Sequence, residues 1–229
     1  NNTMSIRYKI GYIDEDPNQV KLYKRKLRVY GFEVIGYEFH KGMTIEELME
    51  QVYSSNIDLL MIDFRLNESN VIPFNGDVVE RYVYENKPLF PHIIFTNKVD
   101  QAEPDVDDLK LIFDKEIVFP EDEGNNLRTH HFIEVLTKSI EQYKTYINGK
   151  KEKISELLDK EEAGGLNAKE KNDLLSLQNE LLCLDKMSIS EVPESLKSFE
   201  TLEKISQARK DAEAYIQSLL EKIDDESKR

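Results

Sequence analysis

Residues 57–66, with the sequence IDLLMIDFRL, decide the fold of this chain. The unbroken apolar run from Leu59 to Ile62 is typical of a parallel strand that is buried on both faces. The run ends at Asp63, and open α/β sheets place their chemistry at the carboxyl ends of their strands. Asp63 is therefore the first candidate for a functional residue, although a strand can also end in a polar residue without any function.

The rest of the N-terminal region alternates between strand and helix patterns. Apolar runs predict further strands over residues 8–13, 33–39, 91–96 and 109–114. Helical spacing predicts helices over residues 17–30, 44–53 and 76–83, whereas residues 98–108 favour at most one turn. Such alternation predicts a doubly wound, five-stranded parallel sheet.

Polar residues follow four of these strands. They are Asp14, Glu15, Asp16, Asp63, Thr96 and Lys115. Because the carboxyl ends of parallel strands meet at one edge, we expect these side chains to lie close together. Clustered carboxylates repel one another unless a hard cation lies among them, and Mg²⁺ prefers such oxygen ligands. A hydroxyl and an ammonium group opposite could then hold the oxygens of a phosphoryl group on Asp63.

In this order the set resembles the receiver domain of two-component response regulators. The matching stretches are YIDEDP at residues 12–17, LMIDFRL at 60–66, IIFT at 93–96 and IFDK at 112–115. The resemblance covers residues 8 to about 145 and implies a flavodoxin-like receiver fold. It also implies the roles of the site residues: Asp63 as phosphoacceptor, Asp14 and Glu15 with Asp63 as the Mg²⁺ site, Thr96 as switch hydroxyl and Lys115 as the phosphate-contacting lysine. Asp16 reads better as a helix cap than as a ligand.

Two positions depart from the family pattern. Glu116 stands where the family usually has proline, and Ile112 stands where it usually has an aromatic switch residue. With the fourth helix also degraded, the face that rearranges upon phosphorylation is expected to be remodelled. A pseudo-receiver adaptor that keeps the fold without phosphorylation is therefore an alternative.

The last part of the chain is a different kind of sequence. From Thr129 onward apolar residues step by three and four, which predicts one long helix that continues the receiver's last helix and ends at Gly164. Asn167 is expected to cap a second helix, and Pro193 to open a third. These helices predict an antiparallel coiled-coil hairpin or small bundle, closed on itself or shared with a second chain as a homodimer. The expected domains are residues 4–128 and 129–229.

Composition limits the partners. The 31 basic and 45 acidic residues give a net charge of −14, which repels nucleic acid and anionic membranes alike. A single cysteine excludes an internal disulfide. The sequence contains no apolar run as long as a membrane span, so we expect a cytoplasmic protein.

We therefore expect a signalling protein and not an enzyme. Its receiver would take a phosphoryl group from a histidine kinase and report it through a protein partner bound by the C-terminal helices. A phosphohydrolase of the haloacid-dehalogenase-like class is a weaker alternative, with Asp107 and Asp108 as its later acidic motif. That class has no need for a carboxylate at Asp63, which favours the receiver.

Overall fold

Five parallel strands form the centre of the structure, a computed structural model that describes residues 5–68, 70–106, 109–120 and 126–185. The strands are β1 (Tyr8–Ile13), β2 (Phe32–Gly36), β3 (Leu59–Ile62), β4 (His92–Thr96) and β5 (Ile112–Asp114). Their order is β2-β1-β3-β4-β5, and every neighbouring pair is parallel. The predicted doubly wound, flavodoxin-like sheet is confirmed.

The helices are α1 (Pro17–Arg28), α2 (Ile45–Ser54), α3 (Gly76–Asn86), α4 (Val99–Ala102), α5 (Lys115–Val118), α6 (Asn126–Gly164) and α7 (Ala168–Leu184). Side-chain caps explain several of their starts. Asp16 accepts a hydrogen bond from the Asn18 N–H at the start of α1, as predicted. Thr44 and Asn167 form capping boxes at the starts of α2 and α7.

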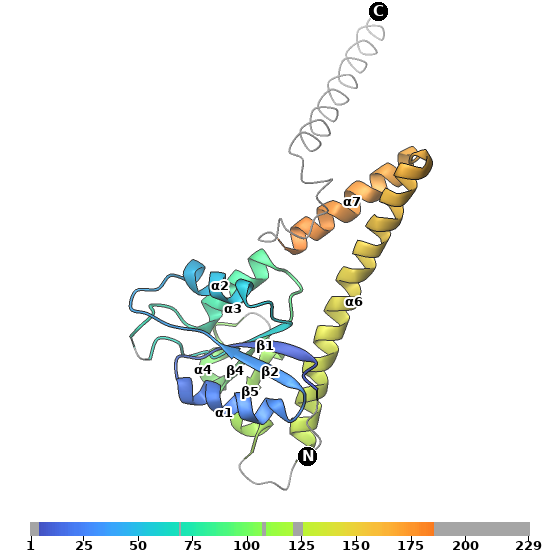
Figure 1. Cartoon of the computed structure of the whole chain (residues 1–229). Helices are drawn as coiled ribbons and strands as arrows, with labels where there is room; N and C mark the ends of the chain where they lie inside the picture. The colour runs from blue at the N-terminus through green and yellow to red at the C-terminus, as the bar shows by residue number, and fades with distance from the viewer. Residues whose placement is uncertain (1–4, 69, 107–108, 121–125, 186–229) are drawn as a thin grey trace, which may run out of the picture. The chain divides into compact units, whose positions relative to one another are not determined.

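Two apolar cores cover the two faces of the sheet. Helices α2 and α3 lie on one face and α1 on the other (Figure 1). The first part of α6 belongs with α1, since Phe132, Leu136 and Ile140 are buried in the same cluster as Leu27. Residues Leu59 to Ile62 of β3 are fully buried between these layers, because β3 is flanked by β1 and β4.

Some predicted boundaries were wrong near β5. The strand expected from Leu109 begins only at Ile112, because residues Leu109–Leu111 form a 3₁₀ turn. The one-turn fourth helix is confirmed as α4. Lys115 was expected to follow a strand and does so directly, as the first residue of α5.

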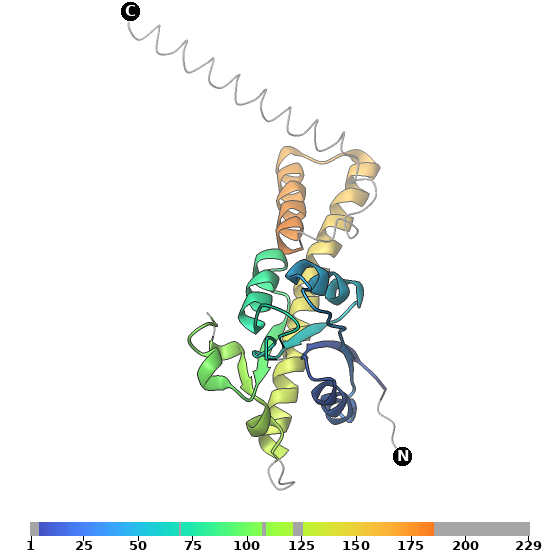
Figure 2. The ribbon, with the colours of Figure 1, turned by 90° about the vertical axis from the view of Figure 1, so that its left-hand side faces the viewer.

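Helices α6 and α7 form the predicted antiparallel hairpin: they meet at a turn in Figure 1 and stand beside each other in Figure 2. Ion pairs join Lys150 to Glu180 and Lys160 to Glu170, so the two helices run in opposite directions. At the far end of α7, Asp185 pairs with Lys87 at 2.8 Å, which ties the hairpin to the end of α3.

Contacts divide the chain into two units, Asn1–Asp185 and Lys186–Arg229. The second unit lies outside the described residues, and so does the helix predicted from Pro193. The domain division expected at residue 128 falls within α6 and stays a prediction. Among the described helices, none has the length and apolar character needed to span a membrane.

Alanine substitutions at two glycines should change the stability of the protein in opposite directions. A Cβ at Gly76 would lie 2.4 Å from the Asp63 carbonyl oxygen, whereas a Cβ at Gly149 meets nothing within 4 Å. We predict that Gly76→Ala lowers the free energy of unfolding by about 1–3 kcal/mol through overpacking beneath the site. Gly149→Ala should raise it by about 0.5–1 kcal/mol, because glycine is a poor residue inside a helix. Urea unfolding measures both, and shifts of the same sign would contradict this packing.

Candidate functional site

The carboxyl edge of the sheet brings together residues from four strands. Ile13 lies beside Ile62 in the register, which places Asp14 and Asp63 next to each other where β1 and β3 end. Thr96, the last residue of β4, pairs with Asp114, and Lys115 follows immediately. Residues that are 101 positions apart in sequence, Asp14 and Lys115, therefore touch.

The Lys115 ammonium group is the centre of this site. Its Nζ donates to Asp14 Oδ2 at 2.8 Å and to Asp63 Oδ1 at 2.7 Å. All three residues are buried. The rings of Tyr12 and Phe95 lie 5.5 Å and 5.9 Å from Nζ, within the range of cation–π attraction. One buried positive charge thus faces two carboxylates.

Backbone and hydroxyl donors fix the two carboxylates further. Asp14 Oδ1 accepts from the Asp16 N–H at 2.9 Å, and Asp14 Oδ2 accepts from the Tyr12 hydroxyl at 2.5 Å. Asp63 Oδ2 accepts from the Arg65 N–H at 2.8 Å. Since each carboxylate offers about four lone-pair sites, Asp14 keeps one open position among these contacts and Asp63 keeps two.

The other predicted site residues lie at the same edge with different contacts. The buried Thr96 hydroxyl accepts from the Lys98 N–H at 3.1 Å. Glu15 follows Asp14 and is partly exposed. Asp16 caps α1, as expected. The direct cluster therefore consists of Asp14, Asp63 and Lys115.

The donor set suits a magnesium ion, although it is not a complete protein cage. Among the described residues, no group of three or more His, Cys, Asp or Glu side chains is arranged to hold a metal. Mg²⁺ needs only one or two carboxylates because it keeps several waters. Asp14 and Asp63 supply buried oxygens with open lone pairs, and Glu15 is adjacent.

Burial controls the protonation of the site. It raises the pKa of Asp63 from 3.8 to about 6; the Asp14 charge adds to this rise, and Lys115 opposes it. Burial and the charge of Asp14 raise the pKa of Tyr12 far above its ordinary value, so its hydroxyl stays protonated as a donor.

The two departures from the receiver pattern have local structural explanations. Asp114 caps α5 by accepting from the N–H groups of Glu116 at 2.8 Å and Ile117 at 3.0 Å. Proline at position 116 would remove the first of these donors. Ile112 is partly buried and packs against the α2–α3 core.

The sequence analysis missed Tyr12. Its hydroxyl contacts Asp14, a predicted ligand, from two residues earlier in the chain. Side chains at positions i and i+2 of an extended strand point to the same face. The signal was a side chain with a polar tip at the buried end of β1, two residues before Asp14.

Comparisons with solved structures find a sensor protein and response regulators. A sensor protein from Polaromonas sp. JS666 matches with a TM-score of 0.44 and 16% identity, over 60% of this chain and 98% of its own. The response regulator TrrA of Thermotoga maritima, in complex with Mg²⁺-BeF, matches with a TM-score of 0.39 and 20% identity, over 57% and 99%. A response regulator receiver domain protein of Clostridium thermocellum matches with a TM-score of 0.41 and 17% identity, over 61% and 99%.

These matches cover about three-fifths of the chain and nearly all of each matched chain. No protein-family model matches the chain, and no curated protein matches it.

The raised pKa of Asp63 predicts a pH-dependent stability. Since the folded protein binds this proton more tightly than the unfolded chain, the wild type loses stability as pH rises from about 4 to about 6. Asp63→Asn removes this loss. The free energy of unfolding of the variant minus that of the wild type should therefore rise by on the order of 2 kcal/mol as the pH goes from 4 to 7.

Urea unfolding at several pH values measures this difference. Asp16→Asn is the matched control, because the partly exposed Asp16 is a helix cap and asparagine caps equally well. A pH-independent difference between Asp63→Asn and the wild type would contradict the assignment.

Proposed function

We propose that the α/β part of this chain is a phosphoryl-accepting receiver and that Asp63 is the acceptor. The observation that supports this most strongly is the contact of one buried ammonium group, Lys115 Nζ, with both Asp14 and Asp63. A cation held between two carboxylates at the carboxyl edge is suited to stabilise the added charge of a phosphoryl group.

The hydrogen bonds of the two carboxylates indicate that Asp63 is a better nucleophile than Asp14. Asp14 Oδ2 already accepts from both Tyr12 and Lys115, whereas each oxygen of Asp63 has a single donor. Each Asp63 oxygen therefore retains a lone pair for the formation of a bond. At neutral pH most of the Asp63 carboxyl is ionised, because its pKa is raised only to about 6.

In the proposed step, an Asp63 oxygen attacks the phosphorus carried by a histidine of a partner kinase. The new O–P bond forms as the N–P bond breaks, and the histidine nitrogen keeps the electron pair of the broken bond. Lys115 then moves toward the phosphoryl oxygens, and Thr96 supplies a hydroxyl at the same edge. The product is an acyl phosphate on Asp63.

Asp14, Glu15 and Asp63 would hold the magnesium ion. When bound, Mg²⁺ supplies positive charge that offsets the phosphoryl oxygens. The chain's own residues orient the carboxylates before that happens, through the Asp16 and Arg65 N–H groups.

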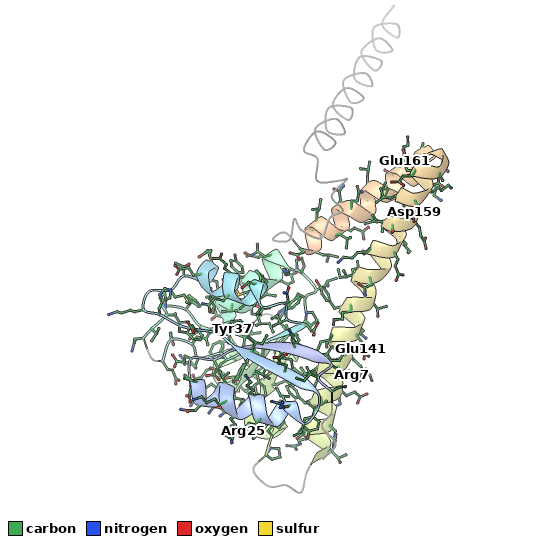
Figure 3. All side chains as sticks on the ribbon, in the orientation of Figure 1. Arg7, Arg25, Tyr37, Glu141, Asp159 and Glu161 are labelled. Atoms are coloured by element: carbon green, nitrogen blue, oxygen red, sulfur yellow. The ribbon has the colours of Figure 1, made fainter. Side chains whose placement is uncertain are left out.

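We further propose that the helical hairpin is the output and binds a protein, so the chain acts in signalling and not as an enzyme. Helix α6 supports this role because it is continuous from the sheet to the hairpin. Arg7 and Glu141 pair at 3.7 Å where α6 passes β1 (Figure 3). A shift of the sheet edge against α6 could therefore be carried into the hairpin as a rigid movement.

One observation also favours the pseudo-receiver adaptor. Lys115 offsets one of the two carboxylate charges of Asp14 and Asp63, so part of the charge that a cation would balance is already balanced. In that case the fold would serve only for docking, and Asp63 would stay unmodified.

Phosphorylation distinguishes these two readings. We predict that the full chain, incubated with Mg²⁺ and acetyl phosphate, gains the mass of one phosphoryl group at Asp63. Asp63→Asn should show no gain, because the amide cannot form an acyl phosphate. Lys115→Ala should reduce the yield by roughly tenfold or more, since a charge-stabilising group is lost.

Intact-protein mass spectrometry measures the result, with Asp16→Asn as the control that should react like the wild type. An unmodified wild type, beside a reactive receiver from another protein, would leave the pseudo-receiver as the better account.

A shortened chain tests the role of the hairpin. Ending the chain after Asn148 keeps Phe132, Leu136, Ile140 and Tyr143, which pack on the sheet, and removes the hairpin. We predict that this chain still accepts phosphate but no longer retrieves its protein partner in pull-downs. Nuclease treatment should leave the partner of the full chain unchanged, because the chain carries a net charge of −14. If the shortened chain captures the same partner, the hairpin does not bind it and the proposed output role is wrong.

A further inference from the structure

Tyr12 contributes a polar group to a strand that is otherwise apolar at its end. The residue is fully buried, and its ring packs edge-on against Tyr23 and Phe95 at centroid distances of 5.9 Å and 6.1 Å. Its hydroxyl donates to Asp14 Oδ2 at 2.5 Å. A phenylalanine would pack in the same place, so packing alone does not explain the hydroxyl.

The hydroxyl shares its acceptor with Lys115. Both groups donate to Asp14 Oδ2, while Asp14 Oδ1 accepts from the Asp16 N–H. Together the three donors fix the plane of the Asp14 carboxylate and leave its open position on Oδ1. The same ammonium group also donates to Asp63 Oδ1, so any movement of Lys115 toward a ligand on Asp63 loosens its contact with Asp14.

We propose that Tyr12 is a positioning residue that keeps Asp14 hydrogen-bonded and oriented when Lys115 transfers to a phosphoryl group on Asp63. This inference rests on the proposed function of Asp63. Without the hydroxyl, the transfer would leave Asp14 Oδ2 buried and without a donor, which is costly for a charged group. With the hydroxyl, Lys115 can leave while Asp14 stays in place.

A positioning role of Tyr12 affects the binding of Mg²⁺ and the binding of a phosphoryl mimic differently, whereas a packing role would affect both alike. Binding of Mg²⁺ alone would leave Lys115 between the carboxylates, so loss of the Tyr12 hydroxyl should change the Mg²⁺ affinity little. Binding of a phosphoryl mimic to Asp63 draws Lys115 away, so the hydroxyl matters most in that state. Loss of the hydroxyl should therefore weaken the binding of the mimic more than the binding of Mg²⁺.

The experiment uses the full chain, with Mg²⁺ and beryllium fluoride as probes. Isothermal titration calorimetry measures the Mg²⁺ affinity, and fluorine NMR measures the affinity for beryllium fluoride at saturating Mg²⁺. For Tyr12→Phe we expect a Mg²⁺ affinity within about twofold of the wild type and an affinity for beryllium fluoride that is lower by roughly tenfold.

Tyr37→Phe is the matched control, since it also removes one tyrosine hydroxyl that bonds within the protein. That hydroxyl contacts Ser55 at 2.9 Å instead of a site carboxylate; Tyr37 itself is labelled in Figure 3. Both affinities of this variant should equal those of the wild type, and urea unfolding shows whether each variant is folded.

The outcomes distinguish this inference from the proposed function. If the wild type binds beryllium fluoride and Tyr12→Phe binds it equally well, Tyr12 has no positioning role and the receiver function stands. An equal loss of both affinities in Tyr12→Phe also overturns the inference, since it shows a general disturbance of Asp14. If the wild type fails to bind beryllium fluoride, the proposed function falls and the inference with it.

Discussion

The buried Lys115 ammonium group is the interaction on which the site depends. It lies 2.8 Å from Asp14 and 2.7 Å from Asp63, so one positive charge holds two carboxylates together away from water. Removing Lys115 would leave two buried carboxylates without their counter-charge, which costs several kcal/mol in proteins. The cluster still carries an excess negative charge, and this excess contributes to the raised pKa of Asp63. An added cation therefore has a physical reason to bind there.

The fold brings Asp14, Asp63 and Lys115 to one edge of the sheet. The central strand β3 can be apolar throughout because layers of helices cover both faces of the sheet. The parallel register then sets Asp14 beside Asp63, and the cap of α5 by Asp114 fixes the start of the helix that carries Lys115. Helix α6 joins this sheet to the hairpin, whose end is held at Lys87 by Asp185. One continuous helix therefore packs on the sheet that carries the site and also forms the first half of the proposed output.

Local patterns in the sequence were sufficient to predict most of this arrangement. The apolar run before Asp63, the Asp16 cap and the helical spacing after Thr129 each reflect a short-range rule, and the structure confirms each of them. The start of β5 was wrong because residues Leu109–Leu111 are apolar but form a 3₁₀ turn. The sharing of Lys115 by two carboxylates depends on distances between strands, which spacing along a chain does not encode. The contact of Tyr12 with Asp14 joins residues two positions apart, so the sequence carried a local signal for it, which was missed.

The most direct test of the central claim is a crystal structure of the full chain with Mg²⁺ and beryllium fluoride. The account predicts beryllium bonded to an Asp63 oxygen, with Lys115 Nζ hydrogen-bonded to a fluorine atom and withdrawn from Asp14. Asp14 should keep its hydrogen bond from Tyr12 in that state. A structure in which Lys115 still bridges Asp14 and Asp63, with no beryllium on Asp63, would contradict the assignment of Asp63 as a phosphoryl acceptor.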